Sequence, residues 1–263
     1  MSDSISSNLP FLYSIDGGSV TITQYTGTSI EPVIPDEIEA KPVTAIGERA
    51  FSGKPIISVT GGQFVTEIGA GTFYLCRSLL SVPLSDHLIS IGDNAFGLCD
   101  ALTTVELPDS VASIGCECFA QCNALFSVDI GSGLKSIGCQ AFYNNRALRA
   151  FSVSEDNAVF SSVDGVLFDQ QTAELVQYPL GRQDKEYQVP EGVRSIRAYA
   201  FAWAGVRHIT LPDSMVSIGD YAFAHSTIRN IYFGKNLRTI GKDAMKYCHM
   251  LQDVTFPAGL TEI

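Results

Sequence analysis

Basic side chains are scarce in the first half of this chain. Residues 1–130 hold 4 Lys or Arg residues against 15 Asp or Glu residues, whereas residues 131–263 hold 13 of each. The formal charge of −11 therefore arises entirely in the first half. An acidic half repels phosphate backbones, so we expect no nucleic-acid partner.

Long apolar runs are also missing. Residues 1–30 contain no Lys or Arg and no apolar run of the length found in a secretory signal peptide. No stretch approaches the ~20 apolar residues of a transmembrane helix. We expect no membrane insertion of this chain, and a signal peptide that had already been removed would leave no trace.

Motifs for catalysis or cofactor binding are absent. The four His residues form no i, i+4 pair of the kind found in zinc hydrolases, and the sequence has neither G-x-S-x-G nor a phosphate-binding glycine loop. Carboxylates at neighbouring strand positions, such as Glu106 and Asp129, are better explained as a solvated surface. We therefore expect no enzyme activity and no cofactor.

What the chain does contain is a repeat of nearly constant length. Each repeat has an Ile, a short turn and then a Phe or Met. The Ile residues are Ile46, Ile68, Ile91, Ile114 and Ile137, spaced by 22, 23, 23 and 23, followed by Ile196, Ile218 and Ile240, spaced by 22 and 22. Such a period is typical of a solenoid, in which each unit buries its apolar face only against its neighbours.

Residues 91–108 show the complete repeat. Asp93 is suited to cap a short helical turn that points Phe96 inward, and the alternation at Val105 and Leu107 predicts a strand with one apolar face. The residues just before each repeat Ile predict a second, shorter extended segment. Stacked in register, the longer strands are expected to form a parallel sheet.

This pattern resembles the leucine-rich repeats of the BspA-like family of bacterial surface proteins, which run L-x-x-V/I-x-I/L-P-x-x-V-x-x-I-G-x-x-A-F-x-x-C. The resemblance extends from about Val43 to Ile263. It implies an α/β fold, namely a right-handed leucine-rich-repeat solenoid with a parallel sheet on the concave face and short helical turns and short strands on the other side. It also implies a cell-surface or secreted protein that adheres to a protein or glycan ligand.

We interpret residues 1–263 as a single leucine-rich-repeat solenoid. Residues 1–42 are expected to form an N-terminal capping hairpin, and residues 151–186 a hairpin insertion within one repeat. Ile263 falls where the next Ile-Gly corner is due. The C-terminal coil is therefore expected to be uncapped and able to make an end-to-end contact with a partner.

The cysteines divide into two groups. Four of the seven follow the repeat Phe or Met by three residues, which predicts a column of buried thiols. Cys116 and Cys139 follow a Gly at the same repeat position and should be stacked neighbours, but the sequence leaves open whether they form a disulfide. A zinc site that combines them with Cys118 and Cys122 is disfavoured, because those two side chains should point inward.

Two columns of side chains in the second half are the candidate ligand-binding site, because Arg and exposed aromatic residues anchor interfaces and flat rings stack on sugars. The strand-flanking Arg column comprises Arg149, Arg207 and Arg229; the aromatic column, two residues after the repeat Phe or Met, comprises Trp203, His225 and Tyr247; His208 and Tyr232 lie at outward strand positions. Alternatively, the aromatic column packs along the coil edge and the Arg column is a solvated face.

The sequence therefore favours a non-catalytic binding scaffold with a protein or glycan ligand. One alternative is a structural spacer within a larger surface protein. A second is a polysaccharide-acting enzyme on a parallel β-helix, which would need carboxylates and basic residues gathered in one groove.

Overall fold

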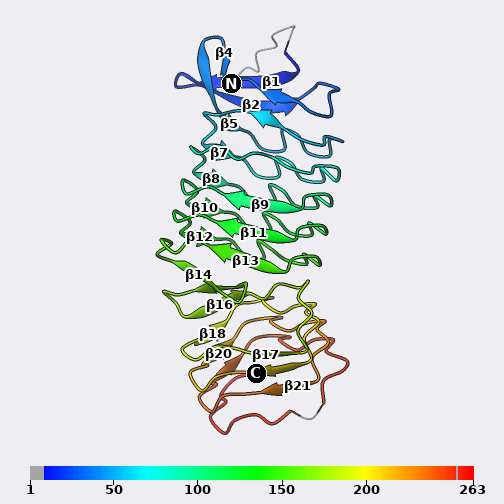
Figure 1. The fold of residues 1–263 in the computed structure, drawn as a ribbon, viewed down its shortest axis with the longest axis vertical. Helices are drawn as coiled ribbons and strands as arrows, with labels where there is room; N and C mark the ends of the chain where they lie inside the picture. Colours follow the sequence, from blue (N-terminus) through cyan, green and yellow to red (C-terminus); the bar gives the residue numbers. More distant parts are fainter. Residues whose placement is uncertain (1–8, 253) are drawn as a thin grey trace. The chain divides into compact units, whose positions relative to one another are not determined.

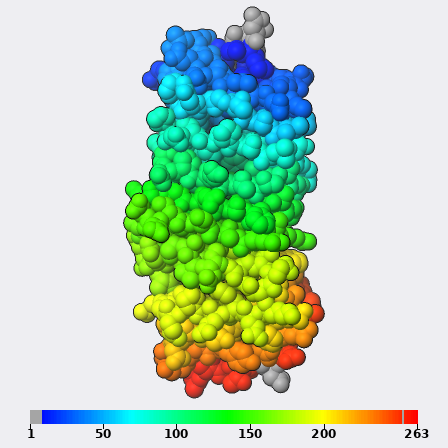
Figure 2. All heavy atoms as spheres, viewed as in Figure 1, coloured from blue at the N-terminus to red at the C-terminus, as the bar shows by residue number. Residues whose placement is uncertain are grey.

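The structure, a computed structural model, describes residues 9–252 and 254–263 (Figure 1). The chain divides into two compact units, Met1–Asn145 and Arg146–Ile263. In the first unit the chain winds through successive coils. The colours of this unit change in bands from blue to green in Figure 2, because each coil occupies its own layer of the surface.

Residues 9–145, the described part of the first unit, form twelve strands, most of them only two residues long. They are β1 (Phe11–Asp16), β2 (Ser19–Tyr25), β3 (Val33–Ile34), β4 (Glu37–Ile38), β5 (Lys41–Ile46), β6 (Thr60–Gly61), β7 (Glu67–Ile68), β8 (Ser90–Ile91), β9 (Thr104–Leu107), β10 (Ser113–Ile114), β11 (Ser127–Ile130) and β12 (Ser136–Ile137).

The repeat Ile residues form a ladder through the first unit. Ile46 lies opposite Ile68 in a parallel pair, and the same pairing continues through Ile91 and Ile114 to Ile137. A second parallel pair, β9 with β11, comes from the longer strand of each repeat. The predicted stacking of equivalent residues in successive coils is thus confirmed.

A hairpin precedes the first coil. Strands β1 and β2 pair antiparallel, joined at Gly17 and Gly18, which both adopt positive φ angles. Strand β2 then pairs in parallel with β5 and places Ile22 opposite Ile46. The hairpin therefore extends the Ile ladder by one step and covers one side of β5.

The second unit contains the remaining strands. They are β13 (Ala150–Val153), β14 (Phe160–Val163), β15 (Val166–Asp169), β16 (Glu174–Gln177), β17 (Glu186–Gln188), β18 (Ser195–Ile196), β19 (His208–Thr210), β20 (Ser217–Ile218), β21 (Asn230–Tyr232) and β22 (Thr239–Ile240). Strands β14, β15 and β16 form an antiparallel meander. Strand β16 starts a parallel ladder through β18, β20 and β22, and β17, β19 and β21 form a second parallel sheet.

Stacked aromatic rings fill the centre of each unit. In the first unit, Phe73, Phe96 and Phe119 are spaced by 5.2 and 5.1 Å between ring centroids, and Phe119 lies 5.8 Å from Phe142. In the second, Phe201 lies 4.8 Å from Tyr178 and 5.2 Å from Phe223. These rings are buried, so the apolar face of each coil is covered by its neighbours, as a solenoid requires.

The expected helical turns are not found, and the α/β class is therefore not confirmed. The described residues contain strands and turns but no helix. In the turn after Ile91, Gly97 N–H donates to the Asn94 carbonyl, but Phe96 and Leu98 donate to the next coil. Because every second N–H bonds outside the turn, the consecutive local bonds of a helix cannot form.

The column of Cys residues is buried and hydrogen-bonded. The thiols of Cys76, Cys99 and Cys122 donate to the carbonyls of the Phe residues 25 or 26 positions earlier, at 3.0, 3.3 and 3.1 Å. Burial raises the pKa of Cys76 to about 11 and that of Cys122 to about 12. These thiols therefore remain protonated at neutral pH.

Cys116 and Cys139 are joined by a disulfide. Their Cα atoms are 4.6 Å apart, and the two residues are 23 positions apart in the sequence. The bond links equivalent positions of two adjacent coils in the first unit. It answers the question that the sequence left open.

Candidate functional site

The aromatic column predicted from the sequence exists in the second unit. The Trp203 and His225 rings are stacked with centroids 4.0 Å apart, and Tyr247 follows at 4.7 Å from His225. Trp203 is 39% exposed and Tyr247 52% exposed, and His225 is also exposed. The column is therefore a continuous aromatic surface open to solvent.

The backbone explains why these rings project outward. Trp203, His225 and Tyr247 have φ angles of 68°, 59° and 58°, in the left-handed region. Trp203 N–H donates to the Ala224 carbonyl at 2.9 Å, and His225 N–H to the Lys246 carbonyl at 2.8 Å. Main-chain hydrogen bonds between adjacent coils hold this left-handed conformation. The turn therefore does not depend on packing of this side chain in the core.

A second aromatic stack lies four residues before the first, and it was not predicted. The rings of Tyr199 and Tyr221 are 5.1 Å apart with an interplanar angle of 9°. The Lys246 ammonium lies 5.5 Å from the Tyr221 ring and pairs with Asp243 at 3.1 Å. A hydrogen bond to Asp243, followed by desolvation, raises the pKa of Tyr221. This stack could have been predicted from the sequence, because a Tyr stands four residues before both Trp203 and His225.

Only part of the predicted Arg column is assembled. Arg229 N–H donates to the Arg207 carbonyl at 2.7 Å, and Arg207 N–H to the Lys185 carbonyl at 2.9 Å. The column therefore runs through Lys185, Arg207 and Arg229. Arg149 is exposed and directly precedes β13, which is not a strand of the β17–β19–β21 sheet.

Lys185 is a member that the sequence analysis missed. Its place could have been found, because Lys185 stands two residues before Tyr187 just as Arg207 stands two residues before Ile209. Tyr187 and Ile209 are paired in register. The insertion before β17 hid this equivalence.

His208 and Tyr232 lie on neighbouring strands of the same sheet. Ile209, which follows His208, pairs with Ile231, which precedes Tyr232, and both Ile side chains are buried. Because side chains alternate along a strand, those of His208 and Tyr232 point away from the core. Tyr232 is 59% exposed, and His208 is half-buried. These two residues extend the candidate surface along β19 and β21.

A pocket of about 440 Å³ brings the aromatic and Arg columns together. Trp203 and Arg207, which the sequence analysis placed in separate columns, both line it. The other lining residues are Arg146, Leu180, Arg182, Gln183, Asp184, Lys185 and Gly205. Arg146 lies 5.8 Å from the centroid of the Trp203 ring, on which it forms a cation–π contact.

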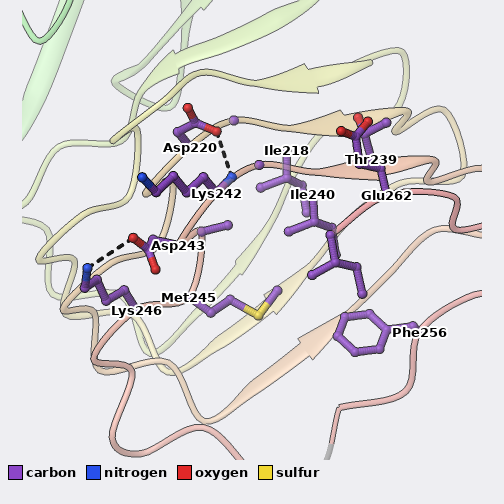
Figure 3. A pocket seen from close by; sticks show the side chains of 14 residues that line it. Ile218, Asp220, Thr239, Ile240, Lys242, Asp243, Met245, Lys246, Phe256 and Glu262 are labelled. Carbon is purple, nitrogen blue, oxygen red and sulfur yellow. Dashed lines mark hydrogen bonds and ion pairs between the residues drawn. The ribbon is translucent and has the colours of Figure 1, made fainter.

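A larger pocket of about 800 Å³ lies at the last coils of the second unit (Figure 3). Ile218, Ile240 and Met245 form its apolar side, with Phe256 beside them. Asp220 accepts a hydrogen bond from the Lys242 N–H at 2.8 Å at its polar rim. The predicted contact of this end with a partner stays a prediction.

The alternative of a four-thiolate zinc site is wrong. Cys116 and Cys139 are bonded to each other, while Cys118 and Cys122 are buried. Within the part of the chain that the structure describes, no group of three or more His, Cys, Asp or Glu side chains is arranged to hold a metal ion. Since those same residues contain no helix, they include none that could span a membrane.

Stacked coils, most of them 22 or 23 residues long and each with an Ile followed by a Phe or Met, define a leucine-rich-repeat solenoid. The sequence matches the BspA type leucine rich repeat region in six copies, over residues 44–168 and 183–263. The chain therefore belongs to the BspA-type leucine-rich-repeat family, as its repeat pattern predicted.

Solved structures share this fold. A leucine rich cell surface protein from Faecalibacterium prausnitzii is 24% identical, with a TM-score of 0.63 over 100% of this chain and 85% of that chain. The pneumococcal vaccine antigen PcpA is 20% identical, with a TM-score of 0.73 over 99% and 85%. A leucine-rich repeat protein from Eubacterium ventriosum is 20% identical, with a TM-score of 0.67 over 98% and 85%. No curated protein matches the chain.

Proposed function

We propose that this chain is a non-catalytic binding module of a bacterial surface or secreted protein, and that its second unit binds a protein or glycan ligand. The observation that carries the proposal is the exposed stack of Trp203, His225 and Tyr247. Exposed aromatic rings next to Arg are the side chains that contribute most to interfaces, because they offer large contact areas with little loss of conformational entropy.

Two further observations support a location of this protein outside the cytoplasm. A disulfide such as Cys116–Cys139 persists in oxidising compartments and is rare in the cytosol. The similar protein from Faecalibacterium prausnitzii is described as a cell surface protein. Membership of the family agrees with a binding role, since solenoids offer extended, rigid surfaces to ligands.

The test is a binding screen of the intact chain against extracellular-matrix proteins and a glycan array. We expect at least one ligand whose binding weakens by about tenfold or more in Trp203→Ala with Arg207→Ala. The matched control is Gln121→Ala, because Gln121 occupies the same turn position in the first unit with a similar φ of 60°. The absence of any ligand would instead favour a structural spacer.

A further inference from the structure

The pocket beside Trp203 has an excess of positive charge. Four cations and one carboxylate line it, namely Arg146, Arg182, Lys185, Arg207 and Asp184. The charge of Arg182 is offset internally, because its Nε lies 2.5 Å from Asp184 Oδ2. The Tyr178 hydroxyl also donates to Asp184, at 3.0 Å. Asp184 is thus already engaged by Arg182 and Tyr178.

Lys185 and Arg207 supply the charge that a ligand would meet. Both side chains are exposed, and the hydrogen bond from Arg207 N–H to the Lys185 carbonyl makes them neighbours on adjacent coils. Among the described residues, no ion pair joins either one to a carboxylate. Two adjacent cations in a hollow attract an anionic group and can hold it by charge-assisted hydrogen bonds.

Trp203 gives the same pocket an apolar wall. One face of its ring is covered by His225 at 4.0 Å, and the Arg146 guanidinium lies 5.8 Å from the ring centroid. The part of the indole that stays exposed, 39% of the residue, offers an apolar contact for the C–H groups of a sugar, which an Asp or Glu side chain has in smaller number. The volume, about 440 Å³, falls within the ~300–1,000 Å³ of small-ligand pockets.

We propose that this pocket binds an acidic saccharide, a sugar unit carrying a carboxylate or sulfate group. Lys185 and Arg207 hold the anionic group, and the exposed part of the Trp203 indole contacts the sugar ring. This inference rests on the proposed binding function and names its ligand class. An acidic peptide is the competing ligand that the test must separate.

Gly205 offers a precise way to change the charge of the pocket. A Cβ added at Gly205 meets no atom within 4 Å, and its φ is not in the left-handed region. The Cβ of Gly205→Glu therefore has room, and the substitution adds a carboxylate at a residue that lines the pocket. Gly205→Gln has nearly the same shape but no charge, and it serves as the matched control.

The experiment measures binding of the intact chain to four probes: a heparin oligosaccharide, an oligogalacturonate, a dextran oligosaccharide and poly-glutamate. We expect binding to one or both acidic saccharides, which also distinguishes sulfate from carboxylate. That binding should weaken with rising salt and fall by at least about tenfold in Gly205→Glu and in Lys185→Ala with Arg207→Ala. Gly205→Gln should stay within about twofold of the unchanged chain.

Three results would overturn the inference: no binding of either acidic saccharide, equal affinity for poly-glutamate, or equal affinity of Gly205→Glu and Gly205→Gln. These results differ from failure of the proposed function. If a ligand from the wider screen depends on Trp203 but not on the charge at Gly205, the binding role stands and the acidic-saccharide assignment is wrong. If the screen yields no ligand, both fail.

Discussion

The imidazole of His225 lies parallel to the indole of Trp203, with ring centroids 4.0 Å apart and an interplanar angle of 2°. Trp203 is the single Trp of the chain, so fluorescence excited at a wavelength that Trp but not Tyr absorbs reports on this stack. The two rings come from adjacent coils, and their contact therefore depends on the coils being in register.

Replacing His225 should change the environment of Trp203. In His225→Ala one face of the indole becomes solvated, so we expect emission at longer wavelength and stronger quenching by acrylamide. Stability should change by no more than about 0.5 kcal/mol, since His225 is exposed. His87→Ala, at an exposed position of the first unit, is the control and should leave the emission unchanged. Identical spectra for the two variants would contradict the stack.

Reduction of the Cys116–Cys139 bond should destabilise the first unit. The bond closes a loop of 23 residues, which corresponds to ~3 kcal/mol in the chain-entropy description of disulfides. We expect a lower urea midpoint in the presence of a reductant. The variant Cys116→Ser with Cys139→Ser should show the lower midpoint under both conditions, and a further decrease on adding reductant would argue against the assignment.

Stability should fall in alkaline solution because of the buried thiols. The pKa of Cys76 is raised by burial from 9.0 to about 11. That of Cys122 is raised, also by burial, to about 12. The folded chain therefore keeps protons that the unfolded chain releases, so this contribution is complete below pH 9 and is lost as the pH rises through 11.

The measurement is the urea midpoint between pH 8 and 11, in the Cys116→Ser, Cys139→Ser background so that disulfide exchange is prevented. Adding Cys76→Ala and Cys122→Ala should reduce the steepness of the alkaline decrease, whatever its effect at pH 8. An unchanged slope would show that these thiols do not carry the effect.

Truncation of one ring in the aromatic core should be severe. Phe119 is 1% exposed and lies between Phe96 and Phe142, so Phe119→Ala leaves a cavity between two coils. We expect a loss of about 3–5 kcal/mol in the free energy of unfolding. Phe64→Ala, at a residue 40% exposed in the same unit, should cost much less. Equal losses would mean that the stack is not the core.

The ladders could be predicted from the sequence because a solenoid repeats one environment. Ile91 and Ile114 are 23 residues apart, and they lie opposite each other in β8 and β10. The family resemblance depended on the same regularity. Where the period was interrupted, as before β17, the equivalence of Lys185 and Arg207 was missed.

The error at the turns has a local cause. Asp93 followed by inward Ala95, Phe96 and Cys99 fits a short helix and also fits a turn with left-handed residues. What separates them is the hydrogen bond from Phe96 N–H to the Cys118 carbonyl, at 2.8 Å, on the next coil. The residue pattern of a single repeat cannot reveal a hydrogen bond to the next coil. The pocket beside Trp203 escaped prediction for the same reason, since it joins residues from 146 to 207.

The left-handed residue that follows the repeat Phe or Met by two positions has a consequence for how such chains diversify. This position holds Leu98, Gln121 and Asn144 in the first unit, and Trp203, His225 and Tyr247 in the second. Since bonds between main chains hold the turn, a mutation there alters what is displayed while the Ile and Phe ladders keep their packing. A new specificity can therefore arise by single substitutions along one edge, without a new fold.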